Sequence, residues 1–233
     1  MYGYYGYGFD PTFILIIIGL VISLWASWFV KHNFNKYDQY DSRRGTTGAE
    51  AARYILDQAG LQSIQINRVS GNLTDNYNPG DKTLNLSDST YGSTSVAAIG
   101  VAAHECGHAI QDQKSYAPMR LRAALVPAVN LGSQASIPLI FVGMILGMNH
   151  TLITVGIWLF ALVVLFQVVT LPVEFNASGR AIKILSSGDL LESDEVPMVK
   201  KVLGAAALTY VAAAISTALQ LLRLILIFGN NRD

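Results

Sequence analysis

Four long apolar stretches alternate with polar segments along the chain. They run over residues 12–30, 123–148, 151–171 and 202–228. A helix needs about 20 predominantly apolar residues to cross a bilayer, so each stretch predicts a transmembrane helix. Only a short turn around Asn149 separates the second stretch from the third, which predicts a helical hairpin. We therefore expect a mainly α-helical integral membrane protein with about four transmembrane helices.

The first apolar stretch has no features of a cleaved leader. No Lys or Arg precedes it, and no Ala-x-Ala-like cleavage site accompanies it. An uncleaved anchor is therefore favoured over a signal peptide. Residues 1–11 are rich in Tyr and Gly, and tyrosines beside a span usually lie at the headgroup level. We interpret this N-terminus as interfacial rather than as a binding segment.

Positive charge is unevenly distributed among the polar segments. Residues 31–122 and 172–201 contain most of the Lys and Arg, whereas residues 1–11 and the turn around Asn149 contain none. Because positively charged loops stay on the cytoplasmic side, we expect both basic segments inside and the N-terminus outside. Net charge is zero, so no basic excess suggests a nucleic-acid partner.

The composition agrees with a membrane protein. Hydrophobic residues make up 52% of the chain and charged residues only 14%, whereas soluble domains usually carry about 25% charged residues. The single cysteine, Cys106, excludes an intrachain disulfide framework.

Short periodic segments occupy the polar region at 31–122. Apolar residues recur at helical spacing over 47–60, where Gly60 suits a helix C-terminus. Residues 61–69 and 82–87 alternate as strands do, and a turn cluster at 76–81 lies between them. We expect a small α+β cytoplasmic part with a helix, a β-hairpin and a further helix from about Thr94.

The most specific chemical motif lies in that last helix. His104, Glu105 and His108 form an H-E-x-x-H pentad within an apolar run of small residues. Residues four apart lie on one face of a helix, so both imidazoles can reach one Zn²⁺ at about 2.0–2.1 Å. Glu105 could then take a proton from a water on the metal, and Gly107 permits close approach of another backbone. The alternative, a buried helix with two satisfied histidines, leaves the desolvation of these side chains uncompensated.

A catalytic zinc site needs a third protein ligand and an open position. The strongest candidate is Glu174, because the hairpin of the second and third spans returns it to the membrane face of the histidines. We expect Pro172 to begin a new helix segment that carries this glutamate. A solvated interfacial glutamate is the alternative. Asn176 or Ser178 is expected to hydrogen-bond to the ligands.

Other candidates for the third ligand fit less well. His150 lies at the opposite membrane face by the charge argument, and His32 adjoins the first span. Cys106 lies roughly 200° around the helix from either histidine. We expect Cys106 to be a small residue packed behind the metal helix, and a redox switch is the alternative.

Three segments of the chain resemble a known family. Residues 95–111, the preceding Leu84-Asn-Leu-Ser run and the Leu171-Pro-Val-Glu-Phe-Asn-Ala-Ser run are similar to the YugP-like neutral zinc metallopeptidases of bacterial membranes. The resemblance covers nearly the whole chain. More distantly, the chain is similar to the HtpX and CAAX-prenyl-protease gluzincins, which pair H-E-x-x-H with a downstream Glu ligand.

The resemblance implies a zincin-like α+β part and one Zn²⁺ per chain. It implies His104, His108 and Glu174 as metal ligands and Glu105 as the catalytic base. The more distant relatives usually carry Asp four residues after the Glu ligand, where this chain has Ser178, and the partner of the ligands at that place is therefore open.

The expected activity is that of a zinc metalloendopeptidase at the cytoplasmic face of the inner cell membrane. Its substrates would be peptides or membrane proteins that reach the site from the lipid bilayer. Peptide hydrolysis also needs a side chain that stabilises the oxyanion. The sequence does not choose among four candidates: Tyr77, Tyr91, Arg180 and Tyr210. An edge strand beside the metal helix could hold an extended peptide, or the hairpin only covers that helix.

Two other functions fit part of the pattern. A non-catalytic zinc-binding membrane scaffold or interaction protein would keep the metal ligands without needing Glu105. A transporter would place charged residues within its spans, which are nearly charge-free apart from Arg223. A homo-oligomer or a scaffold partner stays open, because a second subunit could supply the oxyanion-stabilising group.

Overall fold

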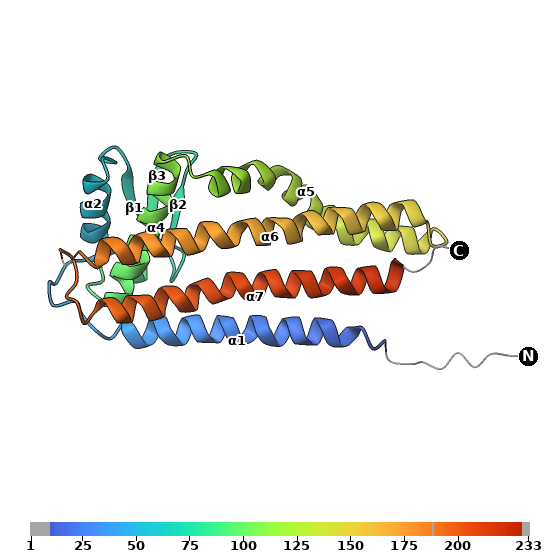
Figure 1. The fold of residues 1–233 in the computed structure, drawn as a ribbon, viewed down its shortest axis with the longest axis horizontal. Coiled ribbons are helices and arrows are strands. Elements are labelled where there is room, and N and C mark those ends of the chain that lie inside the picture. Colours follow the sequence, from blue (N-terminus) through green and yellow to red (C-terminus); the bar gives the residue numbers. More distant parts are fainter. Residues whose placement is uncertain (1–9, 188, 230–233) are drawn as a thin grey trace, which may run out of the picture. The chain divides into compact units, whose positions relative to one another are not determined.

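The computed structural model describes residues 10–187 and 189–229 (Figure 1). Long helices account for most of these residues. In chain order the elements are α1 (Phe13–Tyr37), α2 (Gly48–Gln58), β1 (Gln65–Val69), β2 (Asn76–Asn78), β3 (Thr83–Ser87), α3 (Asp88–Tyr91), α4 (Val96–Gln113), α5 (Ala117–Ile145), α6 (His150–Leu185) and α7 (Val196–Phe228). The predicted mainly helical class with a small α+β part is confirmed. The interfacial N-terminus that we predict falls largely on residues 1–9, outside the described part.

The chain divides into two compact units. The helical unit takes in Met1–Trp25, Leu125–Gln167 and Ala212–Asp233. The α/β unit takes in Ala26–Ala124 and Val168–Val211.

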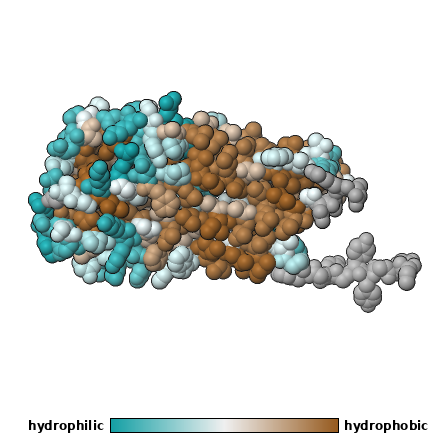
Figure 2. Space-filling model, viewed as in Figure 1, coloured by the Kyte–Doolittle hydropathy of each residue, from teal (hydrophilic) through white to brown (hydrophobic). Residues whose placement is uncertain are grey.

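Four helices, α1, α5, α6 and α7, are long and apolar enough to cross a membrane. Much of the surface along these long helices is hydrophobic in Figure 2, and the hydrophilic surface gathers at one end of the view. Several large apolar side chains of the helical unit are more than half exposed, including Leu20, Leu131, Ile145 and Trp158. Soluble monomers rarely expose so much contiguous apolar surface, whereas lipid tails accommodate it.

Small residues hold α5 and α6 together within the helical unit. A Cβ atom at Gly156 would lie 2.8 Å from the backbone oxygen of Ser136, and one at Gly132 would lie 2.8 Å from that of Leu159. Glycine at both places lets the two backbones approach closely, as is common between membrane helices. The predicted helical hairpin is therefore tightly packed.

The sheet of the α/β unit differs from the predicted hairpin. β3 lies in the centre, parallel to β1 and antiparallel to β2, in the order β1-β3-β2. The two predicted strands are β1 and β3, so they are parallel neighbours, and the hairpin joins β2 to β3 instead. The predicted pairing is wrong because the turn signals at 76–81 concealed β2. A strand of three residues with two Asn carries almost no propensity signal.

Helix α2 covers one side of α4. Thr47 caps the start of α2, because its side chain accepts a hydrogen bond from the Glu50 N–H and the Glu50 carboxylate accepts one from the Thr47 N–H. This reciprocal pair satisfies two donors at the helix start. Gly60 follows the helix with a φ of +74°, as its predicted place at the C-terminus requires. Ile55 of α2 shares one buried core cluster with Cys106 of α4 and Ala181 of α6, so these three helices pack around a common core.

Helix α6 continues through Pro172 to Leu185, so the predicted start of a new helix segment at Pro172 is wrong. Proline removes one backbone hydrogen bond and usually kinks or ends a helix. Here the following turns are anchored by side chains that are fully buried: Val173, Ala177 and Ala181. Their packing outweighs the proline, and Glu174 lies on the same helix as the third apolar stretch.

Candidate metal centre

Helix α4 sets the spacing of the two motif histidines. The helix begins after Ser95, whose hydroxyl accepts a hydrogen bond of 3.1 Å from the Ala98 N–H, close to the predicted start. His104 and His108 lie one turn apart, with their rings edge to face and 4.8 Å between the ring centres. Their side chains are only 13% and 10% exposed. Both imidazoles are therefore held in a largely dry environment.

Glu174 of α6 completes a group of three metal-ligating side chains. Its Oε2 lies 3.3 Å from His104 Nε2 and 3.5 Å from His108 Nε2, and one ligand atom from each residue lies within 4.8 Å of the others. Gly107 makes this approach of α6 to α4 feasible, because a Cβ there would lie 2.6 Å from the Ala177 backbone oxygen. The predicted close approach of a backbone at Gly107 is confirmed.

Gln111 determines which nitrogen of His108 carries a proton. The Gln111 amide nitrogen donates to the Val173 backbone oxygen at 2.8 Å and to Asn176 Oδ1 at 3.0 Å. Its Oε1 is therefore an acceptor, and it lies 3.0 Å from His108 Nδ1. His108 thus carries its proton on Nδ1 and turns the Nε2 lone pair toward Glu174, the arrangement that a metal ligand needs.

His104 is held by a different partner. Its Nδ1 lies 3.1 Å from Ser178 Oγ, so Ser178 contacts a candidate ligand directly. Asn176 contacts the centre only through Gln111. Sequence reasoning gave Gln111 no role, although a polar residue three positions after His108 lies on the same helix face and was the available signal.

The geometry of the three side chains fits Zn²⁺. Glu174 Oε2 is buried and has no hydrogen-bond donor among the described residues. A carboxylate oxygen and two imidazole nitrogens that converge in a buried place repel one another unless a cation lies between them. Tetrahedral ligands about 2.0–2.1 Å from zinc are about 3.3–3.4 Å apart. The separations of 3.3 and 3.5 Å from Glu174 match that requirement, and the three ligand atoms together lie within 4.8 Å of one another.

Negative charge surrounds His108. Burial lowers the pKa of His108, but the nearby carboxylates of Glu174 and Glu105 and the contact with Gln111 together outweigh burial and raise it. A field that favours a proton at this place also favours a divalent cation.

The edge strand β2 holds Glu105. The Tyr77 N–H donates to Glu105 Oε2 at 2.9 Å, and Glu105 is buried. The Tyr77 hydroxyl donates to Asp112 Oδ2 at 2.7 Å, and Lys82 forms an ion pair with the same carboxylate. Burial and the contact with Asp112 raise the pKa of Tyr77, so its phenol stays neutral. Tyr77 therefore links β2 to α4 through both its backbone N–H and its side-chain hydroxyl.

The four candidates for oxyanion stabilisation lie in different places. Tyr210 of α7 lies beside the ligands, where its hydroxyl interacts with the Glu174 carboxylate. The hydroxyl of Tyr77 is already engaged away from the ligands. Tyr91 lines a hollow next to β1, and Arg180 lines a cavity on the α2 side. Within the described residues, Tyr210 is therefore the only one of the four candidates whose hydroxyl or guanidinium group lies near Glu174.

Arg122 is a residue of the centre that sequence reasoning missed. Its NH1 lies 3.6 Å from Glu174 Oε1, the oxygen that does not face the histidines. In the sequence Arg122 is one positive charge before an apolar stretch, and it serves there only as a signal of topology. No spacing rule relates position 122 to position 174.

Three other candidate ligands do not join the cluster. His32 stacks on Trp28 of α1, with 5.2 Å between ring centres, and His150 belongs to the helical unit. Cys106 is fully buried, and its Sγ lies 3.6 Å from the Ala52 backbone oxygen of α2. Burial and then the charge of Glu105 raise the pKa of the Cys106 thiol. The predicted packing of Cys106 behind the metal helix is confirmed.

Comparison with known proteins gives the same picture. The family described as "Putative neutral zinc metallopeptidase" matches residues 12–229. "Putative membrane protease YugP" of Bacillus subtilis (strain 168) is 48% identical over 219 residues, which cover 94% of this chain and 97% of that protein. No solved structure matches the chain. Because the family match and the relative both extend over almost the whole length, the chain belongs to this family of zinc metallopeptidases.

Proposed function

We propose that the chain is a membrane-embedded zinc-dependent endopeptidase that cleaves membrane or membrane-associated proteins. The observation that carries the proposal is the convergence of His104 and His108 on Glu174, at 3.3 and 3.5 Å, with Glu105 next to His104 in the motif. Two imidazoles, one carboxylate and a fourth, open position make up a catalytic rather than a structural zinc site.

Each polar group near the ligands has a role in the proposed hydrolysis. When bound, zinc acts as a Lewis acid that polarises the scissile carbonyl and makes water nucleophilic near neutral pH. Glu105 accepts the proton of the attacking water at the carboxylate oxygen that the Tyr77 N–H does not hold. It then passes this proton to the leaving amine. His104 and His108 offer Nε2 to the ion because their Nδ1 atoms are hydrogen-bonded.

Tyr210 and Arg122 are the groups best positioned to stabilise the oxyanion. The Glu174 carboxylate acts electrostatically on the Tyr210 hydroxyl, and the Arg122 guanidinium lies 3.6 Å from Glu174 Oε1, so both groups are near the place where the scissile carbonyl must meet the ion. A hydroxyl and a guanidinium can each donate a hydrogen bond to the negative oxygen that develops during attack. Removing one such donor usually lowers kcat by about 10²–10³-fold.

The edge strand β2 is the proposed binding strand for an extended substrate. Among the described residues it pairs with β3 on one side only, and it lies against α4, where the Tyr77 N–H donates to Glu105. An extended peptide segment can add to a free strand edge by backbone hydrogen bonds. Such pairing would align the scissile bond with the metal ligands.

The position of the ligands along α6 favours substrates at the membrane surface. Glu174 follows the predicted span at 151–171 by three residues, or about 4.5 Å of helix. The two basic segments, 31–122 and 172–201, favour an orientation with this side of the protein in the cytoplasm and the N-terminus outside. A substrate segment would thus reach the site at the cytoplasmic face of the cell membrane.

The test is zinc stoichiometry together with cleavage of an unfolded membrane protein, for the wild type and Glu105→Gln. Glu192→Gln, an exposed glutamate paired with Arg44, is the matched control. We expect one zinc in all three proteins and cleavage by the wild type and the control only. Zinc in all three with no cleavage would favour a zinc-binding scaffold, and absence of zinc would refute the metal site.

A further inference from the structure

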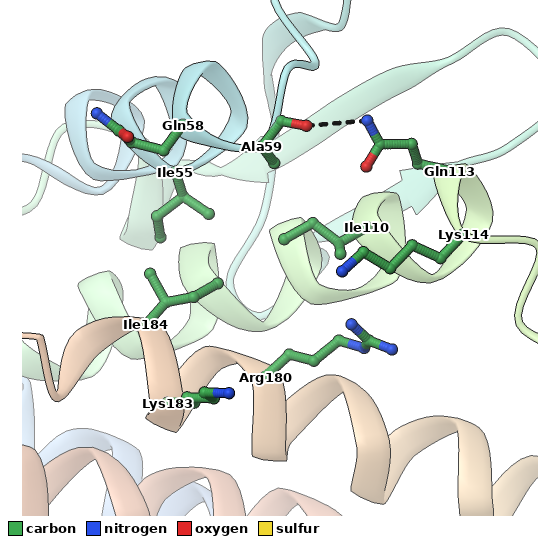
Figure 3. Close-up of a pocket in the computed structure, with 9 residues that line it drawn as sticks. All are labelled: Ile55, Gln58, Ala59, Ile110, Gln113, Lys114, Arg180, Lys183 and Ile184. Carbon is green, nitrogen blue, oxygen red and sulfur yellow. Dashed lines mark hydrogen bonds between the residues drawn. The ribbon is translucent and has the colours of Figure 1, made fainter.

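A cavity of about 430 Å³ opens in the α/β unit between α2, the C-terminal end of α4 and α6 (Figure 3). None of the three candidate zinc ligands lines it. Its size falls within the range of small-molecule sites, about 300–1,000 Å³. It is therefore large enough for a ligand of its own, apart from the candidate metal centre.

Three cations line this cavity without an acidic partner. Lys114 extends from the end of α4 toward Arg180 of α6, and Lys183 lies one turn further along α6 (Figure 3). No Asp or Glu is among the lining residues. Over residues 10–187 and 189–229, neither lysine forms an ion pair. Neighbouring like charges repel one another, so an anion that enters the cavity is attracted by all three.

A hydrogen bond at Nε holds the guanidinium of Arg180 in place. Its Nε donates to Asn176 Oδ1 at 2.8 Å. The terminal nitrogens are left on the side of Lys114 (Figure 3). A planar guanidinium offers paired donors to phosphate or carboxylate oxygens, and lysines add point charges.

Apolar side chains form the rest of the cavity wall. Ile55 of α2 and Ile184 of α6 point toward each other, and Ile110 of α4 lies beside them (Figure 3). A ligand with an anionic end and a small apolar part satisfies both kinds of wall. A phosphate monoester carries about −1.5 to −2 charges near pH 7, which suits three cations better than a single carboxylate does.

A chain of hydrogen bonds leads from this cavity to a candidate zinc ligand. Asn176 Oδ1 accepts from Arg180 Nε and also from Gln111 Nε2, at 2.8 and 3.0 Å. Gln111 Oε1 in turn accepts from His108 Nδ1, at 3.0 Å. A ligand that draws the Arg180 guanidinium into the cavity would therefore alter the contact that orients His108.

We propose that this cavity binds a phosphate-bearing small molecule through Lys114, Arg180 and Lys183, and that binding is transmitted through Asn176 and Gln111 to His108. A soluble phosphate ester and a phospholipid headgroup share this chemistry. Arg180 lies nine residues beyond the predicted span at 151–171, about 13.5 Å along the helix, so a soluble ester reaches it more readily.

The binding test uses the full-length, zinc-loaded protein in phosphatidylcholine nanodiscs, with glycerol 3-phosphate as the calorimetric probe. Lys114→Gln and Lys183→Gln each remove one cavity charge. Lys200→Gln is the matched control, because Lys200 is an exposed lysine of α7 that does not line the cavity. We expect the dissociation constant to rise about tenfold or more in each cavity variant, the usual effect of one charge-assisted hydrogen bond, with zinc content retained. The control should bind as the wild type does.

Nanodiscs that also contain phosphatidylglycerol distinguish the two sources. Loss of glycerol 3-phosphate binding in them identifies a lipid headgroup as the occupant, and unchanged binding identifies a soluble ester. Equal affinity in the wild type and both cavity variants would place the phosphate elsewhere, for example on zinc, and overturn the site. Absence of binding in the wild type, or a response to a short polyglutamate peptide alone, would overturn it too.

The link to His108 has a separate readout. We expect glycerol 3-phosphate to change the rate at which zinc passes to a competing chelator in the wild type and not in Lys183→Gln. An unchanged rate in a wild type that binds the ester would overturn the link. Neither measurement depends on peptide cleavage, so the proposed protease activity is tested independently.

Discussion

The substitution Gly107→Ala should reduce zinc affinity without removing a ligand. The new Cβ would lie 2.6 Å from the Ala177 oxygen and 3.1 Å from the Ala177 carbonyl carbon and Cα. Ordinary contact begins at 3.4 Å, so α4 and α6 must separate by about 0.8 Å. Separations of 3.3 and 3.5 Å between Glu174 and the histidines would then approach about 4 Å, too wide for tetrahedral zinc.

The expected loss of zinc affinity is about 10–100-fold, the scale on which supporting residues of metal sites act. Overpacking costs about 1–3 kcal/mol of stability, and the better helix propensity of alanine offsets about 1 kcal/mol. Chelator competition measures the affinity, and thermal unfolding measures the stability. Gly179→Ala on α6 is the control, because no atom lies within 4 Å of its Cβ, and it should bind zinc normally. Wild-type zinc affinity in Gly107→Ala would refute the argument that this close contact sets the ligand separations.

Three further substitutions test separate parts of the centre. Tyr210→Phe should lower kcat by about 10²–10³-fold and leave zinc content unchanged, and a loss of zinc instead would assign the hydroxyl to ligand support rather than to the oxyanion. Gln111→Leu removes the acceptor that keeps the His108 proton on Nδ1, so zinc affinity should fall about 10–100-fold by chelator competition, with the exposed Gln62→Leu as control. Cys106 is fully buried, and burial raises its pKa, so iodoacetamide should modify it only after unfolding; mass spectrometry that finds the adduct in the folded protein would contradict this.

Local patterns were sufficient for most of the helices, though not for the course of α6 through Pro172, and for two of the three candidate ligands. The spacing of His104 and His108 follows from helix geometry alone, since four residues make about one turn. The caps at Ser95 and Thr47 are equally local, and both helices begin close to the starts predicted at about Thr94 and within residues 47–60. Glu174 required the additional argument that a hairpin of two spans returns the chain to the same membrane face.

Strand pairing was beyond local reasoning. Alternation identified β1 and β3, but it does not say whether two strands run parallel or which strand lies between others. β2 contributes three residues and is recognised by its contacts, chiefly the Tyr77 N–H on Glu105, rather than by its composition. Pro172 likewise reads as a helix boundary until the buried residues that follow it are known.

Hydropathy also leaves two kinds of apolar surface indistinguishable. Val202, Leu203 and Ala205 of α7 are buried, and they belong to the α/β unit, although they lie in the same apolar stretch as the exposed Leu222. The hydropathy of a side chain indicates that it avoids water, but it does not indicate whether protein or lipid surrounds that side chain. Only packing separates the two.

The chain's order of residues thus specifies the membrane class, the metal helix and the chemistry of its ligands, because each depends on neighbours within a few turns. Tyr210, Arg122 and the Gln111 amide join the centre from positions that no periodicity connects. Whether these three side chains reach the centre depends on how α4, α5, α6 and α7 pack. That packing depends in turn on side-chain volume at positions such as Gly107. That is why the folded arrangement distinguishes Tyr210 from the other three candidates by its place near Glu174, whereas the sequence offers all four with equal weight.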